Sequence, residues 1–164
     1  MVSDSVICTV VILTYKGKQH LEYLLPTVEE AIYYSGLNIK ILVIDNGKDQ
    51  VTKDFVISNY PKAEYLFSEK NDYLFSLNPF IKKLASPFFL LLNDDMRVEK
   101  KIFEYLLPLI QNDDDVFAIN CKVVNWDGSG LQSNVRNLRY HKGWAYTAWE
   151  EALAGSVSYT LYAG

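Results

Sequence analysis

The feature that most constrains the fold is a nearly continuous run of apolar, largely β-branched residues from Val6 to Leu13. Such a run is typical of a strand covered on both faces, as the central strands of parallel sheets are. Ile39 to Asp45, Ala63 to Phe67 and Pro87 to Leu92 have the same character, and Val116 to Val124 is expected to add a fifth strand. The sequence therefore predicts a parallel sheet with Val6 to Leu13 near its centre.

Segments with apolar residues at helical spacing separate these strands. We expect them to run from about Leu21 to Gly36, Val51 to Asn59, Leu77 to Leu84 and Glu99 to Ile110. Pro26 predicts either a kink in the first helix or a restart at Thr27, which opens a sequence that fits a capping box. Because alternating strands and helices form right-handed βαβ units, we expect an α/β fold: a Rossmann-like, mostly parallel sheet with helices on both faces.

Composition narrows the classes of function. The 164 residues carry 16 Lys and Arg against 20 Asp and Glu, a formal net charge of -4, so no basic field favours nucleic acid as a partner. Cys8 and Cys121 lie within apolar runs and are expected to be small core residues, not a disulfide or a zinc site. The apolar runs are too short to span a bilayer, which takes about 20 residues. We therefore expect residues 1–164 to form a single domain.

Polar side chains follow three of the predicted strands directly. They are Thr14-Tyr15, Asp45-Asn46-Gly47 and Asn93-Asp94-Asp95. Since parallel strands bring their carboxyl ends to one edge of the sheet, these groups should lie together where α/β proteins bind ligands. Neighbouring carboxylates suit Mg²⁺ or Mn²⁺ with positions left open for phosphate oxygens. Taken singly, Asn46-Gly47 is also compatible with a plain turn, and Asn93-Asp94-Asp95 with a helix cap.

Other polar residues are expected to be structural. His20 and His141 have no partner at the sequence spacing of metal ligands or of a catalytic base. Asp113 to Asp115 follows a helix, which favours a solvated loop. Asp127 to Gly130 predicts a hairpin turn. Ser133 to Glu151 departs from the alternating pattern and is rich in polar and aromatic residues.

The ordered set of motifs resembles the nucleotide-sugar-binding part of a family 2 glycosyltransferase, an inverting enzyme of the A-type glycosyltransferase fold. The matching segments are Val10 to Tyr15 (opening strand), Leu42 to Gly47 (second strand), Leu91 to Asp95 (aspartate-containing DXD metal motif) and Lys122 to Gln132 (hairpin after the fifth strand). The resemblance covers essentially the whole chain. Two positions depart from the pattern: Asn93 replaces the first aspartate of the metal motif, and Tyr73 stands where a glycine commonly follows Asn-x.

The resemblance also implies roles for individual residues. Thr14 and Tyr15 would line the base pocket, Asp45 would bind the base or ribose, Asn71 would approach the nucleotide, Asp94 would lie near the sugar or ribose, and Asp95 would bind Mg²⁺ or Mn²⁺. The implied reaction is transfer of a sugar from a nucleoside diphosphate sugar to a hydroxyl of a carbohydrate or lipid-linked acceptor, as in polysaccharide biosynthesis.

The resemblance assigns no catalytic base within this chain. The family pattern continues past the turn that would begin at Gly164, so the chain is expected to be a C-terminally truncated piece of a longer enzyme, hypothesised to bind nucleotide without turning over. The resemblance further implies a cytoplasmic protein and leaves open a peripheral association with the inner face of a membrane.

Two other functions stay open. A sugar nucleotidyltransferase shares a related sheet and metal carboxylates but normally carries a glycine-rich loop with Arg and Lys, for which Lys16-Gly17-Lys18 is a thin substitute. Pyrophosphate release from a nucleoside triphosphate and a sugar phosphate would identify it. A non-catalytic module that binds carbohydrate or protein through the aromatic segment Tyr140 to Trp149 is the second alternative. Exposure of that segment would also favour a homo-oligomer.

Overall fold

The computed structural model describes residues 5–130 and 135–150. The chain forms two compact units, residues 1–114 and 115–164. The first unit contains an all-parallel sheet with the strand order β3-β2-β1-β4. Its strands are β1 (Cys8–Thr14), β2 (Ile39–Asp45), β3 (Glu64–Phe67) and β4 (Phe88–Asn93). The four predicted strands are confirmed to within two residues at each end, and β1 is central as expected.

The continuous apolar run exists because β1 packs on both faces. Cys8, Val10 and Ile12 join one buried cluster, while Val11 joins another on the opposite face. Successive side chains of a strand point to opposite faces, so a strand covered twice is mostly apolar, and its two buried polar residues, Thr9 and Thr14, each bond to another side chain. Burial raises the pKa of the Cys8 thiol to about 11, which keeps it a neutral core residue as predicted. Cys121 is half-buried and free.

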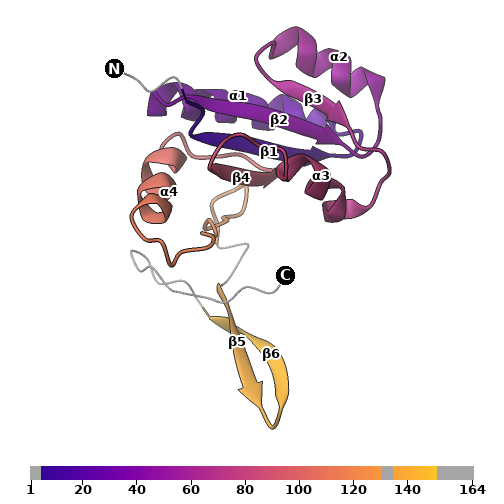
Figure 1. Cartoon of the computed structure of the whole chain (residues 1–164). Coiled ribbons are helices and arrows are strands. Elements are labelled where there is room, and N and C mark those ends of the chain that lie inside the picture. Colours follow the sequence, from indigo (N-terminus) through magenta and orange to yellow (C-terminus); the bar gives the residue numbers. More distant parts are fainter. Residues whose placement is uncertain (1–4, 131–134, 151–164) are drawn as a thin grey trace. The chain divides into compact units, whose positions relative to one another are not determined.

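Helices cover both faces of this sheet, which confirms the predicted fold class (Figure 1). One face packs against α1 (Lys18–Ser35), α2 (Gln50–Asn59) and α4 (Ile102–Gln111), which contribute Leu21, Leu24, Leu25, Val28, Val56, Phe103 and Leu107 to the core. The other face is covered by the short η1 (Tyr73–Leu77) and α3 (Asn78–Ile81), with Leu77 buried and Phe80 and Ile81 partly buried. The helix expected over about Leu77 to Leu84 is present only as the short α3, which follows a 3₁₀ turn and ends at Ile81.

Helix α1 runs through Pro26 without a restart, so the capping box expected at Thr27 is wrong. The Thr27 hydroxyl instead donates to the Leu24 carbonyl over 2.7 Å and accepts the Val98 amide over 3.2 Å. It thereby ties the middle of the helix to the segment that follows β4. The helix ends as predicted before Gly36, which takes a left-handed φ of 64°.

The second unit differs from the sequence-based expectation. Val116 to Val124 forms no strand, since only an isolated bridge at Val124 is present and Phe117 is 97% exposed. An apolar run becomes a strand only where a neighbour accepts its backbone hydrogen bonds, and within the described residues no such ladder forms along 116–123. Asp127 to Gly130 does form a turn, closed by a bond from the Asn125 amide to the Gly130 carbonyl.

A hairpin occupies most of the segment that the sequence showed only as polar and aromatic. It pairs β5 (Val135–His141) with β6 (Trp144–Glu150) in antiparallel register, His141 opposite Trp144. Lys142 and Gly143 both have positive φ, 50° and 82°, as a two-residue hairpin loop requires. Trp144 is exposed. Across the described residues of both units, no helix has the length and apolar character needed to cross a membrane.

The Thr27 contact gives a test of how the segment after β4 is held. Thr27→Val keeps the shape of the side chain but removes the bond to the Val98 amide, so we expect the free energy of unfolding to fall by about 1 kcal/mol in urea titrations. Ser35→Ala is the matched control, because the Ser35 hydroxyl bonds only within its own helix end. Equal effects of the two substitutions would contradict a tertiary role for Thr27.

Candidate functional site

Strand register brings the predicted polar clusters to one edge of the sheet. Thr14 of β1 lies opposite Asp45 of β2, and Leu13 lies opposite Asn93 of β4. Thr14-Tyr15, Asp45-Asn46-Gly47 and Asn93-Asp94-Asp95 therefore leave the sheet side by side at its carboxyl end. This is the position at which open α/β sheets bind ligands.

A hydrogen-bonded group joins the ends of β1 and β4. The buried Thr14 hydroxyl donates to Asp94 Oδ2 over 2.6 Å, and His20 Nδ1 lies 3.3 Å from Asp94 Oδ1. The side chain of Asp94 keeps 17% of its surface exposed. Two partners thus fix the orientation of a carboxylate that solvent still reaches. His20 has no partner nearby in the sequence, as expected, but the fold brings it to Asp94, 74 positions away in the chain.

Gly17 leaves room for the Thr14 and Asp94 side chains to meet. A Cβ atom at this position would overlap Asp94 Oδ2 and the Thr14 hydroxyl oxygen. Gly17 has a φ of -95°, which any residue can adopt, so the need for glycine is steric and not conformational. The loop after β1 is therefore shaped around the Thr14–Asp94 hydrogen bond.

Asp95 and Asn93 differ from Asp94 in being exposed to solvent. Within residues 5–130 and 135–150, no group of three His, Cys, Asp or Glu side chains gathers that could enclose a metal. The carboxylate of Asp95 still fits Mg²⁺ or Mn²⁺ chemically, because such ions use one or two carboxylates and complete their shell with water and phosphate oxygens.

Asp45 lies under this edge and has no exposed surface. Its Oδ1 accepts the Gly47 amide over 2.6 Å, and its Oδ2 accepts the Asp49 amide over 2.6 Å and the Tyr65 hydroxyl over 2.9 Å. Burial and the bond to the Asp45 carboxylate raise the pKa of the Tyr65 phenol. Asp45 therefore shapes the loop that follows β2. Direct binding of a base or ribose by Asp45 stays a prediction.

Asp49 closes the same loop as the N-cap of α2. Its Oδ2 accepts the Thr52 hydroxyl over 2.6 Å and the Thr52 amide over 2.9 Å, and these bonds lower the pKa of the Asp49 carboxyl. A hollow of about 500 Å³ lies beside it, lined by Tyr15 to His20, Asp49 and Val51. The starts of α1 and α2 both contribute to its wall, which favours an anionic or polar ligand.

Backbone strain is concentrated at the same edge. Among the described residues of the first unit, three that are not glycine have positive φ: Lys16 at 54°, Lys48 at 50° and Tyr73 at 49°. They follow β1, β2 and β3 respectively. A left-handed conformation costs roughly 1–2 kcal/mol for such residues, and strain of this kind clusters at ligand-binding sites. The strain marks this edge independently of its carboxylates.

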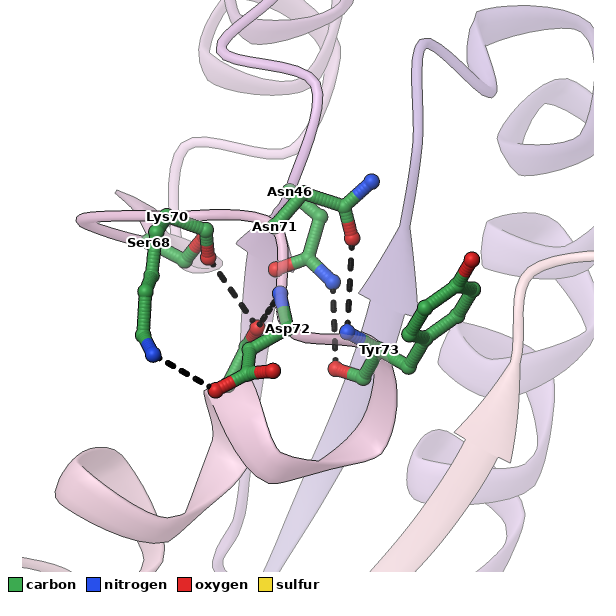
Figure 2. A network of polar contacts seen from close by, with 7 residues as sticks. Asn46, Ser68, Lys70, Asn71, Asp72 and Tyr73 are labelled. Atoms are coloured by element: carbon green, nitrogen blue, oxygen red, sulfur yellow. Dashed lines mark hydrogen bonds and ion pairs between the residues drawn. The ribbon is translucent and has the colours of Figure 1, made fainter.

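Asn71 lies in the loop after β3, which contacts the loop after β2. Its Oδ1 accepts the Tyr73 amide over 3.3 Å, while Asn46 Nδ2 donates to the Tyr73 carbonyl over 3.1 Å (Figure 2). The structure thus places Asn71 near Asn46, at the side of the edge away from Asp94. All six residues named as candidates lie at the carboxyl ends of the strands or in the loops that follow: Thr14, Tyr15, Asp45, Asn71, Asp94 and Asp95.

Comparisons with known proteins agree with this arrangement. The model of the family described as "Glycosyl transferase family 2" matches residues 9–155. This chain belongs to glycosyl transferase family 2. No curated protein matches it significantly.

The chain is also similar to solved structures of TarS from S. aureus. TarS 1-349 matches at 13% identity with a TM-score of 0.56, covering 80% of this chain and 41% of that one. A second TarS structure matches at 17% identity with a TM-score of 0.55, covering 65% of this chain and 20% of that one. At these identities the likeness shows the fold. The chain spans about two fifths of the length of TarS 1-349.

The structure connects two further residues with the candidate carboxylates, and sequence reasoning had connected neither. His20 and Tyr65 both bond to carboxylates at the edge, yet neither lies beside its partner in the sequence. Tyr65 carried one usable signal: the alternation of side chains along β2 and β3 puts Tyr65 and Asp45 on the same face of the sheet. His20 carried none beyond being the third residue of a helix that starts at the edge.

Tyr65→Phe tests the anchoring of Asp45. The substitution removes a buried hydrogen bond to a charged acceptor, so we expect the free energy of unfolding to fall by about 2 kcal/mol in denaturant titrations. Tyr60→Phe is the control, since the Tyr60 ring packs edge-on against Phe55 and its hydroxyl makes no hydrogen bond within the described residues. Equal stability of wild type and Tyr65→Phe would show that the bond contributes nothing.

Proposed function

We propose that this chain is the nucleotide-sugar-binding part of a family 2 glycosyltransferase that acts with inversion and with Mg²⁺ or Mn²⁺. The observation that carries the proposal is the pairing of an oriented carboxylate, Asp94, with an exposed one, Asp95, at the strained carboxyl edge of the sheet. Family membership supports a nucleotide-sugar donor and an acceptor substrate.

Asp94 and Asp95 differ in exposure, which suits them to different roles. Asp94 is held by Thr14 and His20, so it suits accepting hydrogen bonds from hydroxyl groups of the sugar or ribose. Asp95 is exposed and suits a metal that also takes phosphate oxygens of the donor. A bound metal would neutralise charge that develops on the leaving diphosphate. Because the chain has a net charge of -4, a cation between carboxylate and diphosphate also removes the repulsion between them.

The reaction forms a bond from the acceptor oxygen to the anomeric carbon and breaks the bond from that carbon to the diphosphate. Inversion follows from attack on the face opposite the leaving group. The proton of the acceptor hydroxyl passes to a carboxylate base, which the described residues do not identify. On the donor side, Thr14 and Tyr15 would flank the nucleobase. Tyr15 and Lys16 line the hollow beside Asp49.

Calorimetry with uridine, guanosine and thymidine diphosphates, each with and without Mn²⁺, tests the proposal. We expect at least one to bind and its affinity to fall at least about tenfold when EDTA removes the metal. Asp95→Asn should reproduce the loss, because the amide lacks the charge that holds the cation. Asp54→Asn, an exposed carboxylate on α2, is the control and should bind as wild type does. Binding by none of the three with metal present would contradict the proposal.

Gly17→Ala tests whether the Thr14–Asp94 geometry matters for binding. The added methyl group must displace Asp94 or Thr14, so we expect nucleoside diphosphate affinity to fall at least about tenfold. Gly36→Ala is the control: it strains a left-handed residue and should cost about 1 kcal/mol of stability, yet it leaves the site untouched. The idea fails if Gly17→Ala binds as wild type does while remaining folded by circular dichroism.

A further inference from the structure

Tyr73 combines a strained backbone with an exposed ring. Its φ is 49°, a region that favours glycine, and 81% of its surface is accessible to solvent. Its ring takes part in none of the ring–ring or cation–π contacts among the described residues. Glycine at this position would relieve the backbone without any loss of packing. The tyrosine is therefore unfavourable for the fold on both counts.

Two amide side chains hold the Tyr73 backbone in this conformation. Asn71 Oδ1 accepts its amide, and Asn46 Nδ2 donates to its carbonyl (Figure 2). Asn46 is only 7% exposed, and its Oδ1 is buried without a hydrogen-bond partner. The carbonyl of Tyr73 accepts only from the NH₂ group, so this bond fixes the amide orientation and leaves Oδ1 unsatisfied. These two hydrogen bonds, the clamp on Tyr73, are thus maintained although they leave a buried oxygen unsatisfied, which lowers the stability of the fold.

The rest of the loop reinforces the clamp. The Ser76 hydroxyl accepts the Asp72 amide and donates to the Lys70 carbonyl, and Lys70 Nζ lies 2.8 Å from Asp72 Oδ2. The Ser68 hydroxyl donates to the same Lys70 carbonyl. Figure 2 shows the Tyr73 ring pointing away from this network. The loop is a preformed support from which the Tyr73 ring projects, and Phe75, two residues later, is also exposed.

We propose that Tyr73 stacks on the nucleobase of the donor and so contributes to nucleotide recognition. This inference rests on the proposed function. The Asn46 bond holds Tyr73 beside the end of β2, while Asp95 follows β4, and the strand order β3-β2-β1-β4 leaves β1 between them. Neighbouring strands lie about 4.8 Å apart, so two intervals separate the ends of β2 and β4 by about 10 Å. With the diphosphate near Asp95, the base extends toward the loops after β2 and β3.

An aromatic face suits this task because every base offers a π face, and stacking improves affinity by about 5- to 150-fold per base. The strained conformation has a purpose in this arrangement. Because hydrogen bonds already hold its backbone, Tyr73 loses little backbone freedom on binding, so more of the stacking energy appears as affinity.

Calorimetry of Tyr73 variants with Mn²⁺ and three ligands tests the inference: a nucleoside diphosphate that wild type binds, its sugar conjugate, and inorganic pyrophosphate. We expect Tyr73→Ala and Tyr73→Gly to bind both nucleotides at least about fivefold more weakly, Tyr73→Phe to bind as wild type does, and pyrophosphate affinity to stay unchanged. Tyr73→Gly should also raise the thermal midpoint, which excludes misfolding as the cause of weaker binding. Tyr33→Ala removes an exposed tyrosine of α1 and should change nothing.

Several outcomes would overturn the stacking role. Unchanged nucleotide affinity in Tyr73→Gly would remove it, and tighter binding would show that the ring obstructs the site. An equal loss for pyrophosphate would assign Tyr73 to the phosphate end, and a loss confined to the sugar conjugate would assign it to the sugar. Failure of wild type to bind any nucleoside diphosphate would instead contradict the proposed function, so the two failures are distinguishable.

Discussion

The buried carboxylate of Asp45 is the contact on which the ligand edge of this sheet depends. Three donors converge on it: the amides of Gly47 and Asp49 and the hydroxyl of Tyr65. A carboxylate with no access to water is tolerated only when its oxygens are satisfied in this way. The resulting loop positions Asn46 to hold Tyr73 and Asp49 to cap α2, so one interaction organises the contacts of two neighbouring loops.

Several residues at the same edge hold conformations that lower the stability of the fold. Lys16, Lys48 and Tyr73 all hold left-handed backbones at the ends of successive strands, and Asn46 keeps an unsatisfied buried oxygen. The strands behind them carry no such cost, because β1 and β2 are almost wholly buried in regular hydrogen-bonded register. Strained loops persist because the rigid sheet fixes the positions of their ends.

Local pattern was sufficient for the sheet and for the edge at which the candidate residues gather. The apolar runs of β1 and β2 are long enough to identify buried parallel strands, and strand ends necessarily share an edge. The Thr14–Asp94 and His20–Asp94 contacts were beyond reach, because they join residues 80 and 74 positions apart. The failed strand over Val116 to Val124 has the converse cause: its pattern is local, but a strand also needs a partner. Asp45 was located correctly, whereas its burial depends on Tyr65 arriving from β3.

The three carboxylates of the edge form a graded series. Asp45 is buried and accepts bonds from two amides and a phenol. Asp94 is partly exposed and is bonded to Thr14 and His20, and Asp95 is exposed to solvent. Their charges are therefore not equivalent toward an incoming diphosphate, since the hydrogen bonds to Asp45 and Asp94 already stabilise negative charge there. Asp95 carries the charge that is least compensated by the protein. A cation would accordingly gain most at Asp95, and its arrival there would convert the most repulsive point of the edge into the most attractive one for phosphate.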